Sequence, residues 1–101
     1  AYLHLLRADF AGQQHGDVLT PARQAFDGVL VANMGYGADE ASAAISAGAI
    51  DAVAFGTRFL ANPDLPERFR RGAALNTADP STFYSSGPIG YTDYPALAPE
   101  A

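Results

Sequence analysis

Two glycine-containing turns hold the residues of this chain whose types could bind an anion. The first is "NMGYG" at residues 33–37, and the second is "FGTRF" at residues 55–59. Glycine lets backbone N–H groups approach an anion closely, and the start of a following helix adds partial positive charge. In the second turn the Thr57 hydroxyl and the Arg58 guanidinium can add donors. Taken together, the two turns predict a phosphate site.

Each turn alone also fits a plainer interpretation, because a glycine after a strand often serves only to reverse the chain. The surrounding elements favour the phosphate interpretation. Each turn follows a predicted strand and precedes a predicted helix, so both turns fall at the carboxyl ends of strands. In parallel β/α folds, ligands bind at that edge of the sheet.

Apolar runs and helix signals alternate along the chain. We predict three strands and three helices, the strands at 2–6, 28–33 and 50–56 and the helices at 20–26, 38–48 and 63–72. The strands are almost entirely apolar, which predicts burial on both faces. Thr20 is expected as the N-cap of the first helix, with Pro21 at its first position, and Gly48 is expected to close the second.

This alternation predicts parallel strands joined by right-handed crossovers. Three strands are too few to close a barrel, but they fit a consecutive piece of a TIM (β/α)8 barrel, in which the loops after the last two strands often bind phosphate. We expect residues 1–72 to form three β/α units and residues 73–101 to form a tail that is ordered by packing. Because the chain opens within a strand pattern, we expect it to be a fragment of one larger domain.

The composition excludes several classes of protein. Among 101 residues, 49% are hydrophobic and 17% are charged, which is typical of a folded domain. The net charge of −5 argues against a nucleic-acid partner, and the absence of cysteine excludes disulfides and thiolate chemistry. We recognise no signal peptide and no run near the ~20 apolar residues of a membrane span. A cytoplasmic protein without a membrane partner is expected.

The run "AFGTRFLANPDLPERF", followed by "LNTADPSTFYSSGPIGYTDYP", resembles the C-terminal end of the Old Yellow Enzyme family of flavin-dependent ene-reductases. "YLHL" is similar to the sixth strand of that family, and "GVLVANMGY" to the seventh strand and its loop. The resemblance implies an α/β fold, namely the C-terminal three β/α units (strands 6 to 8) of a TIM (β/α)8 barrel plus an ordered C-terminal tail. It also implies FMN as cofactor, NAD(P)H as electron donor and activated alkenes (enones, enals, nitroalkenes) as substrates.

The resemblance assigns the phosphate contacts to both turns. It implies that the backbone amides of Met34 and Gly35 face the FMN phosphate from one loop, and those of Gly56 and Thr57 from the other. Many family members carry Arg directly after the glycine of the eighth strand, where this chain has Thr57. Arg58, one position later, therefore either reaches back to the phosphate or lies on the surface.

Two aromatic residues of the tail complete the implied site. Phe83 matches a residue that packs near the flavin edge, and Tyr84 matches an aromatic residue that lines the substrate pocket. The resemblance places the catalytic residues upstream, so we assign no catalytic and no metal-binding residue here. The isolated chain is expected to be inactive.

Unpaired strand edges on both sides of a three-stranded piece favour association. We expect the chain to pair with a complementary N-terminal barrel chain or with copies of itself. Two other functions stay open: a fragment of another phosphate-binding TIM-barrel enzyme, or a non-catalytic barrel piece that self-associates.

The remaining polar residues have structural interpretations. His4 and His15 are expected as core or rim histidines, and Asp9, Asp17 and Asp27 as loop acids, since they show no ligand spacing.

The "NPDL" motif and the end of the tail are also interpreted as structural. Pro63 and Asp64 are an ordinary helix start. A clamp that holds the tail against the barrel is expected from Tyr91, Asp93, Tyr94 and Pro95.

Overall fold

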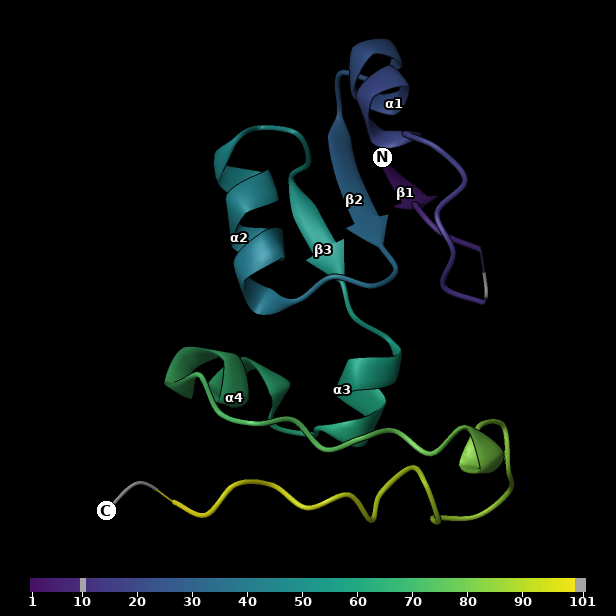
Figure 1. Cartoon of the computed structure of the whole chain (residues 1–101), viewed down its shortest axis with the longest axis vertical. Coiled ribbons are helices and arrows are strands. Elements are labelled where there is room, and N and C mark those ends of the chain that lie inside the picture. Colours follow the sequence, from purple (N-terminus) through teal and green to yellow (C-terminus); the bar gives the residue numbers. More distant parts are fainter. Residues whose placement is uncertain (10, 100–101) are drawn as a thin grey trace. The chain divides into compact units, whose positions relative to one another are not determined.

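The computed structural model describes residues 1–9 and 11–99 (Figure 1). The chain divides into two compact units, Ala1–Phe55 and Gly56–Ala101. The boundary predicted between residues 72 and 73 falls inside the second unit. Among the described residues, no helix is long and apolar enough to cross a membrane.

A parallel three-stranded sheet forms the first unit. Its strands are β1 (Tyr2–Leu6), β2 (Val29–Asn33) and β3 (Ala52–Ala54), in the order β1-β2-β3. Helix α1 (Leu19–Ala25) connects β1 to β2, and α2 (Ala38–Ser46) connects β2 to β3 (Figure 1). The predicted alternation of parallel strands and helices is therefore confirmed for this unit.

The core of this unit lies on one face of the sheet. Leu30, Ala32 and Ile50 are almost fully buried. Partly buried residues from the strands and from both helices pack against this core: Leu3, Leu5, Leu19, Ala22, Ala44, Val53 and Phe55. Right-handed crossovers between strands in consecutive order place both helices on the same face, which is why this face is covered.

The opposite face of the sheet is open in the described chain. Along β1 the exposed residues alternate with partly buried ones, and Tyr2 and Leu6 are 65% and 57% exposed. Val29, which pairs with Tyr2, is 49% exposed. The prediction that the strands are buried on both faces is therefore wrong for β1 and for Val29 of β2, because α1 and α2 both pack against the other face of the sheet. His4 also lies exposed on the open face.

Helix α1 begins one residue earlier than predicted. Asp17 Oδ1 accepts hydrogen bonds from the backbone N–H groups of Leu19 (3.0 Å) and Thr20 (3.2 Å). The N-cap position belongs to Val18, and Pro21 is the third helical residue. Thr20 as N-cap is therefore wrong, because the Asp17 carboxylate already satisfies the first amides of the helix.

The next helix and strand follow the prediction more closely. Helix α2 ends in the predicted glycine: Gly48 has φ 76°, its N–H donates to Ile45 O (3.0 Å), and the Ala49 N–H donates to Ala44 O (3.1 Å). These bonds form a Schellman motif. Strand β3 has three residues and is shorter than the predicted 50–56.

The second unit contains α3 (Thr57–Ala61), α4 (Leu65–Arg71) and the 3₁₀ turn η1 (Pro80–Thr82). Helix α4 confirms the predicted helix, and Gly72 ends it with φ 63°. The five-residue α3 was not predicted, because the glycine turn before it and the "NPDL" motif after it left only a short connection.

A buried asparagine joins α3 to the tail. Asn62 is fully buried; its Nδ2 donates to Arg58 O (2.8 Å), and its Oδ1 accepts from the Asn76 N–H (2.7 Å). Asn76 in turn donates to Ala61 O (2.9 Å) and Pro95 O (2.8 Å). These bonds fix the path of the chain on both sides of α4.

A buried arginine holds the tail against α4. Arg68 is 4% exposed and donates to Asp64 Oδ1 (2.7 Å), Ala74 O (2.8 Å) and Pro95 O (2.8 Å). Asp64 Oδ2 also accepts from the Leu97 N–H (2.8 Å). That backbone bond, together with Arg68, keeps the pKa of Asp64 below its usual value. The interpretation of "NPDL" as structural is supported.

The side chains expected to clamp the end of the tail form hydrogen bonds within the tail itself. The Tyr94 hydroxyl accepts a hydrogen bond from the Asp79 N–H (3.0 Å), and Asp93 Oδ1 accepts one from the Gly90 N–H (2.8 Å). Tyr91 is 39% exposed, so its side chain is not buried by the described tail.

Candidate functional site

The first glycine turn follows β2 and has a strained backbone. Met34 has φ 88° and Gly35 has φ 77°, a region that non-glycine residues rarely adopt. The Met34 N–H donates to Asn33 Oδ1 (2.7 Å), and Met34 O accepts from Arg7 Nε (2.8 Å). Because the Met34 amide is engaged within the turn, the Gly35 amide is the better placed donor for an anion.

Arg7 follows β1 and supports this turn with its whole guanidinium group. Its Nη1 and Nη2 each donate to Glu40 at 2.8 Å, and the group lies 3.7 Å above the centre of the Tyr36 ring. The Arg7 side chain is 10% exposed and Tyr36 is 3% exposed. The hydrogen bonds with Glu40 raise the pKa of Arg7 and lower that of Glu40, whereas burial raises the pKa of Tyr36.

Sequence reasoning did not single out Arg7. A signal was present, since Arg7 directly follows a strand and lies at the same carboxyl edge of the sheet as "NMGYG". Its partners Met34 and Glu40 are 27 and 33 residues away, and such a distance is not readable from local pattern.

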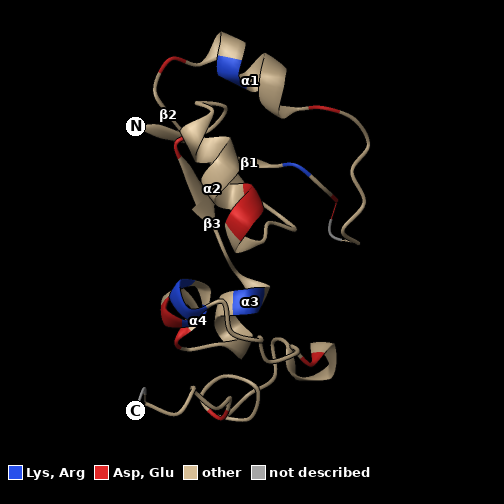
Figure 2. Ribbon diagram, turned by 60° about the vertical axis from the view of Figure 1, so that its left-hand side comes forward, with Lys and Arg blue, Asp and Glu red and all other residues tan. Residues whose placement is uncertain are grey.

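Acidic residues at the start of α2 oppose anion binding. Asp39 and Glu40 both lie in the first turn of the helix, and Figure 2 shows them as a red band on α2. Their charges offset the positive potential of the helix start. Arg7 neutralises Glu40 through two parallel bonds, so part of this opposing charge is removed.

The second glycine turn has a relaxed backbone and open space around it. Gly56 has φ −97°, and a Cβ atom added there would meet no atom within 4 Å. Thr57 and Arg58 are exposed and form the first turn of α3, which contains no acidic residue. The Arg58 carbonyl is held by Asn62. Nothing in the described chain therefore requires glycine at position 56, and close approach of a ligand would explain it.

The predicted pocket residues lie in a third segment. Tyr84 is 96% exposed and has φ 59°, whereas Phe83 is partly buried. A Cβ atom at Gly90 would collide with the Thr82 side chain, and Ser85 Oγ donates to Thr82 O (2.8 Å). The loop is thus closed tightly beneath a strained and exposed tyrosine, a combination that is common at binding sites.

The predicted site residues form three local groups. Met34 and Gly35 lie in the first unit. The second unit holds the other two groups, which are Gly56 with Thr57 and Arg58, and Phe83 with Tyr84. The roles of all seven toward FMN and substrate stay predictions.

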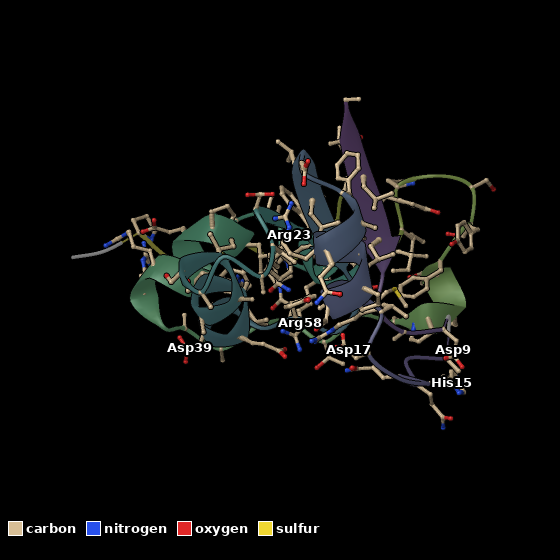
Figure 3. The ribbon with its side chains drawn as sticks, turned by 90° about the horizontal axis from the view of Figure 1, so that it is seen from above. Asp9, His15, Asp17, Arg23, Asp39 and Arg58 are labelled. Atoms are coloured by element: carbon tan, nitrogen blue, oxygen red, sulfur yellow. The ribbon has the colours of Figure 1, made fainter. Side chains whose placement is uncertain are left out.

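Of the predicted loop acids, Asp9 forms hydrogen bonds within its own loop. Asp9 Oδ2 lies 2.7 Å from His15 Nε2, and Asp9 Oδ1 accepts from the Ala11 and Gln13 N–H groups (Figure 3). The bond to His15 lowers the pKa of Asp9. His15 is exposed, so it is not a core histidine.

The opposite ends of the strands carry a second arginine network. Arg23 donates to Asp51 Oδ2 (2.9 Å) and to Gly28 O (2.7 Å), and Asp51 Oδ2 also accepts from the Leu30 N–H (2.8 Å). The Leu30 N–H and Arg23 together lower the pKa of Asp51. In β/α barrels this amino-terminal edge serves stability rather than chemistry.

A parallel β/α segment with glycine turns at the carboxyl ends of its strands is typical of α/β barrel enzymes. No protein-family model matches the sequence. Individual relatives do. The chain is 58% identical over 84 residues to a putative 12-oxophytodienoate reductase 10 of Oryza sativa, covering 82% of the chain and 26% of that protein. It is 47% identical over 97 residues to a probable flavin mononucleotide-dependent alkene reductase of Leishmania infantum, and this match covers 96% of the chain and 26% of that protein.

Solved structures agree with these relatives. The old yellow enzyme from Trypanosoma cruzi matches 96% of the chain with a TM-score of 0.89 and 45% sequence identity. Morphinone reductase matches 95% of the chain with a TM-score of 0.84 and 49% sequence identity. The chain spans 26% of each of these two proteins. The resemblance to the Old Yellow Enzyme family, whose members are TIM-barrel oxidoreductases, is therefore confirmed over this segment.

Proposed function

We propose that this chain forms the C-terminal three β/α units, strands six to eight, of an FMN-dependent NAD(P)H ene-reductase that reduces activated C=C bonds of enones, enals or nitroalkenes. The observation that carries the proposal is the similarity in both sequence and fold across nearly the whole chain to a probable FMN-dependent alkene reductase and to old yellow enzyme. The chain contributes the FMN phosphate site and one wall of the substrate pocket.

The open face of the sheet supports a place in a barrel. Both helices cover one face, and the apolar side chains of Tyr2, Leu6 and Val29 stand on the other. In a closed barrel this second face points inward, where side chains from the other strands cover it. A complementary N-terminal barrel segment is therefore the partner we propose, and a second copy of the chain is the alternative.

We propose that backbone donors of both glycine turns hold the FMN phosphate. The first turn offers the Gly35 amide, and the second offers the amides of Gly56, which has no atom within 4 Å of an added Cβ, and of the exposed Thr57. A short extra helix after the last strand, such as α3, frequently accompanies phosphate sites in these barrels. Bound FMN would supply hydride transfer from NAD(P)H to the alkene, while these residues hold and orient it.

The exposed Tyr84 fits the proposed pocket wall. Its ring is almost fully accessible, and its strained backbone is held by the tight loop below it. Phe83 beside it is partly buried, as expected of a residue that packs near the flavin edge. An aromatic wall of this kind binds planar apolar substrates.

Flavin binding by the assembled protein tests the proposal. We expect the protein to acquire flavin absorbance with FMN and then to oxidise NAD(P)H in the presence of an enone, whereas the isolated chain turns over no substrate. Intact mass and size in solution identify the partner segment. If the assembled protein takes up no FMN, the ene-reductase assignment fails. Uptake of a different phosphate ligand would instead favour another barrel enzyme, and stable oligomers of this chain alone would favour a self-associating piece.

A further inference from the structure

Arg7 is the residue outside the predicted site whose contacts bear most directly on it. Three of its nitrogens are committed: Nε to Met34 O, and Nη1 and Nη2 to Glu40. With a side chain only 10% exposed, it is a fixed part of the loop rather than a mobile surface cation. Because its donors are directed at the protein, it is placed to shape the anion site without itself binding the anion.

The bond from Arg7 to Met34 fixes the peptide group that carries the Gly35 N–H. A trans peptide is planar, so its C=O and N–H point in opposite directions. Holding Met34 O toward Arg7 at 2.8 Å therefore directs the Gly35 N–H away from Arg7. Within the described chain, no hydrogen bond is recorded for that N–H.

The strain in this turn requires such a support. Met34 is a non-glycine residue at φ 88°, and a backbone of this kind persists only where surrounding contacts determine it. Arg7 and Asn33 supply these contacts, one at the Met34 carbonyl and one at its amide. The stacking of Arg7 on the buried Tyr36 ring fixes the guanidinium in turn.

We infer that Arg7 is a positioning residue for the phosphate-binding loop: it aims the Gly35 amide at the FMN phosphate and neutralises Glu40 at the start of α2. This inference rests on the proposed function. It adds a residue that directly follows β1, and it explains how a helix start with two acidic residues can lie beside an anion.

The affinity for FMN compared with that for riboflavin tests this role, because riboflavin lacks only the phosphate. Arg7→Met in the assembled protein removes the guanidinium and keeps an apolar stem. We expect the dissociation constant for FMN to rise roughly tenfold or more, and that for riboflavin to change less than about twofold. We also expect the phosphorus NMR signal of bound FMN to shift.

Arg23→Met is the matched control. Arg23 likewise pairs with a carboxylate and donates to a backbone carbonyl, but it does so at the opposite ends of the strands. We expect this variant to lose stability and to keep the wild-type ratio of the two affinities. Equal losses of FMN and riboflavin affinity in Arg7→Met, or no loss of either, overturn the inference and leave the proposed function standing. If the wild-type protein does not prefer FMN to riboflavin, the phosphate site and the inference fail together.

Discussion

The two glycine turns look alike in sequence and are built differently. The first is strained: Met34 and Gly35 both have positive φ, and Arg7, which directly follows β1, supports the turn through a hydrogen bond. The second is relaxed, because Gly56 has an ordinary φ, has no neighbour for an added Cβ and leads directly into α3. Glycine therefore serves conformation in the first turn, whereas the backbone of the second turn does not require it, and there we propose that it gives a ligand access. The same strand–glycine–helix pattern can therefore be used in two different backbone conformations.

The largest effect on stability is expected from substitution of Asn62, which binds the Arg58 carbonyl in the helix after the relaxed turn. Asn62→Ala leaves the Asn76 N–H and the Arg58 carbonyl without their buried partner. We expect the free energy of unfolding of the assembled protein to fall by about 2–4 kcal/mol in chemical denaturation. Ser86→Ala, in an exposed loop of the same unit, should leave it unchanged. A loss below about 1 kcal/mol in Asn62→Ala would show that α3 does not depend on this asparagine.

The contrast between the glycines predicts a smaller and more specific effect. Gly35→Ala must hold an alanine at φ 77°, which costs about 1–2 kcal/mol of stability even though the new Cβ would contact only Arg7 Nη2 at an ordinary 3.7 Å. Thermal or chemical unfolding measures this loss of stability. Flavin titration should show that the variant loses more affinity for FMN than for riboflavin, relative to the wild-type protein.

Gly56→Ala is the counterpart in the relaxed turn. No strain and no clash arise there, so stability should change by less than about 0.5 kcal/mol. If a phosphate approaches Gly56, the added methyl group weakens FMN binding all the same. Equal stability losses in both variants would contradict the comparison, and unchanged FMN binding in Gly56→Ala would remove the argument for close approach.

The smallest effect separates the two residues after Gly56. Thr57→Val removes the hydroxyl and keeps a side chain of similar shape, and Arg58→Gln removes the positive charge. Both residues are exposed. Substitution of the residue that contacts the phosphate should weaken the binding of FMN about three- to tenfold relative to that of riboflavin. Substitution of the other residue should have no effect. An arginine contact should also weaken with added salt, which a hydroxyl contact should not. If neither variant changes the ratio, the second turn acts through its backbone alone.

Local patterns were sufficient to predict the parallel β/α order and three of the helices, α1, α2 and α4. Helix α2 and helix α4 end at the glycines that the sequence indicates, Gly48 and Gly72. Helix α3 could not be predicted, because five residues between strong turn signals carry no periodicity. The open sheet face was missed for another reason. An apolar strand has the same sequence whether a helix or the rest of a barrel covers it.

The supports of the site were also beyond local pattern. Arg7, Asn62 and Arg68 act on partners between 14 and 33 residues away in the chain. The glycine turns themselves could be found, since strand, turn and helix signals are adjacent in sequence. What each glycine does depends on φ and on neighbours in space, and neither is encoded in a short motif.

The hydrogen bonds that hold the end of the tail determine which of its residues tolerate substitution. Arg68 and Asn76 bind the carbonyl of Pro95, Arg71 binds the carbonyl of Ala98, and Asp64 binds the amide of Leu97. These are main-chain groups that nearly every amino acid offers. Substitutions at residues 95, 97 and 98 should therefore have little effect on the path of this stretch, provided that residue 97 does not become proline, whereas substitutions of the four anchoring side chains should disturb it. The path of residues 95–98 is therefore specified by side chains at positions 64, 68, 71 and 76 and not by the side chains of residues 95–98.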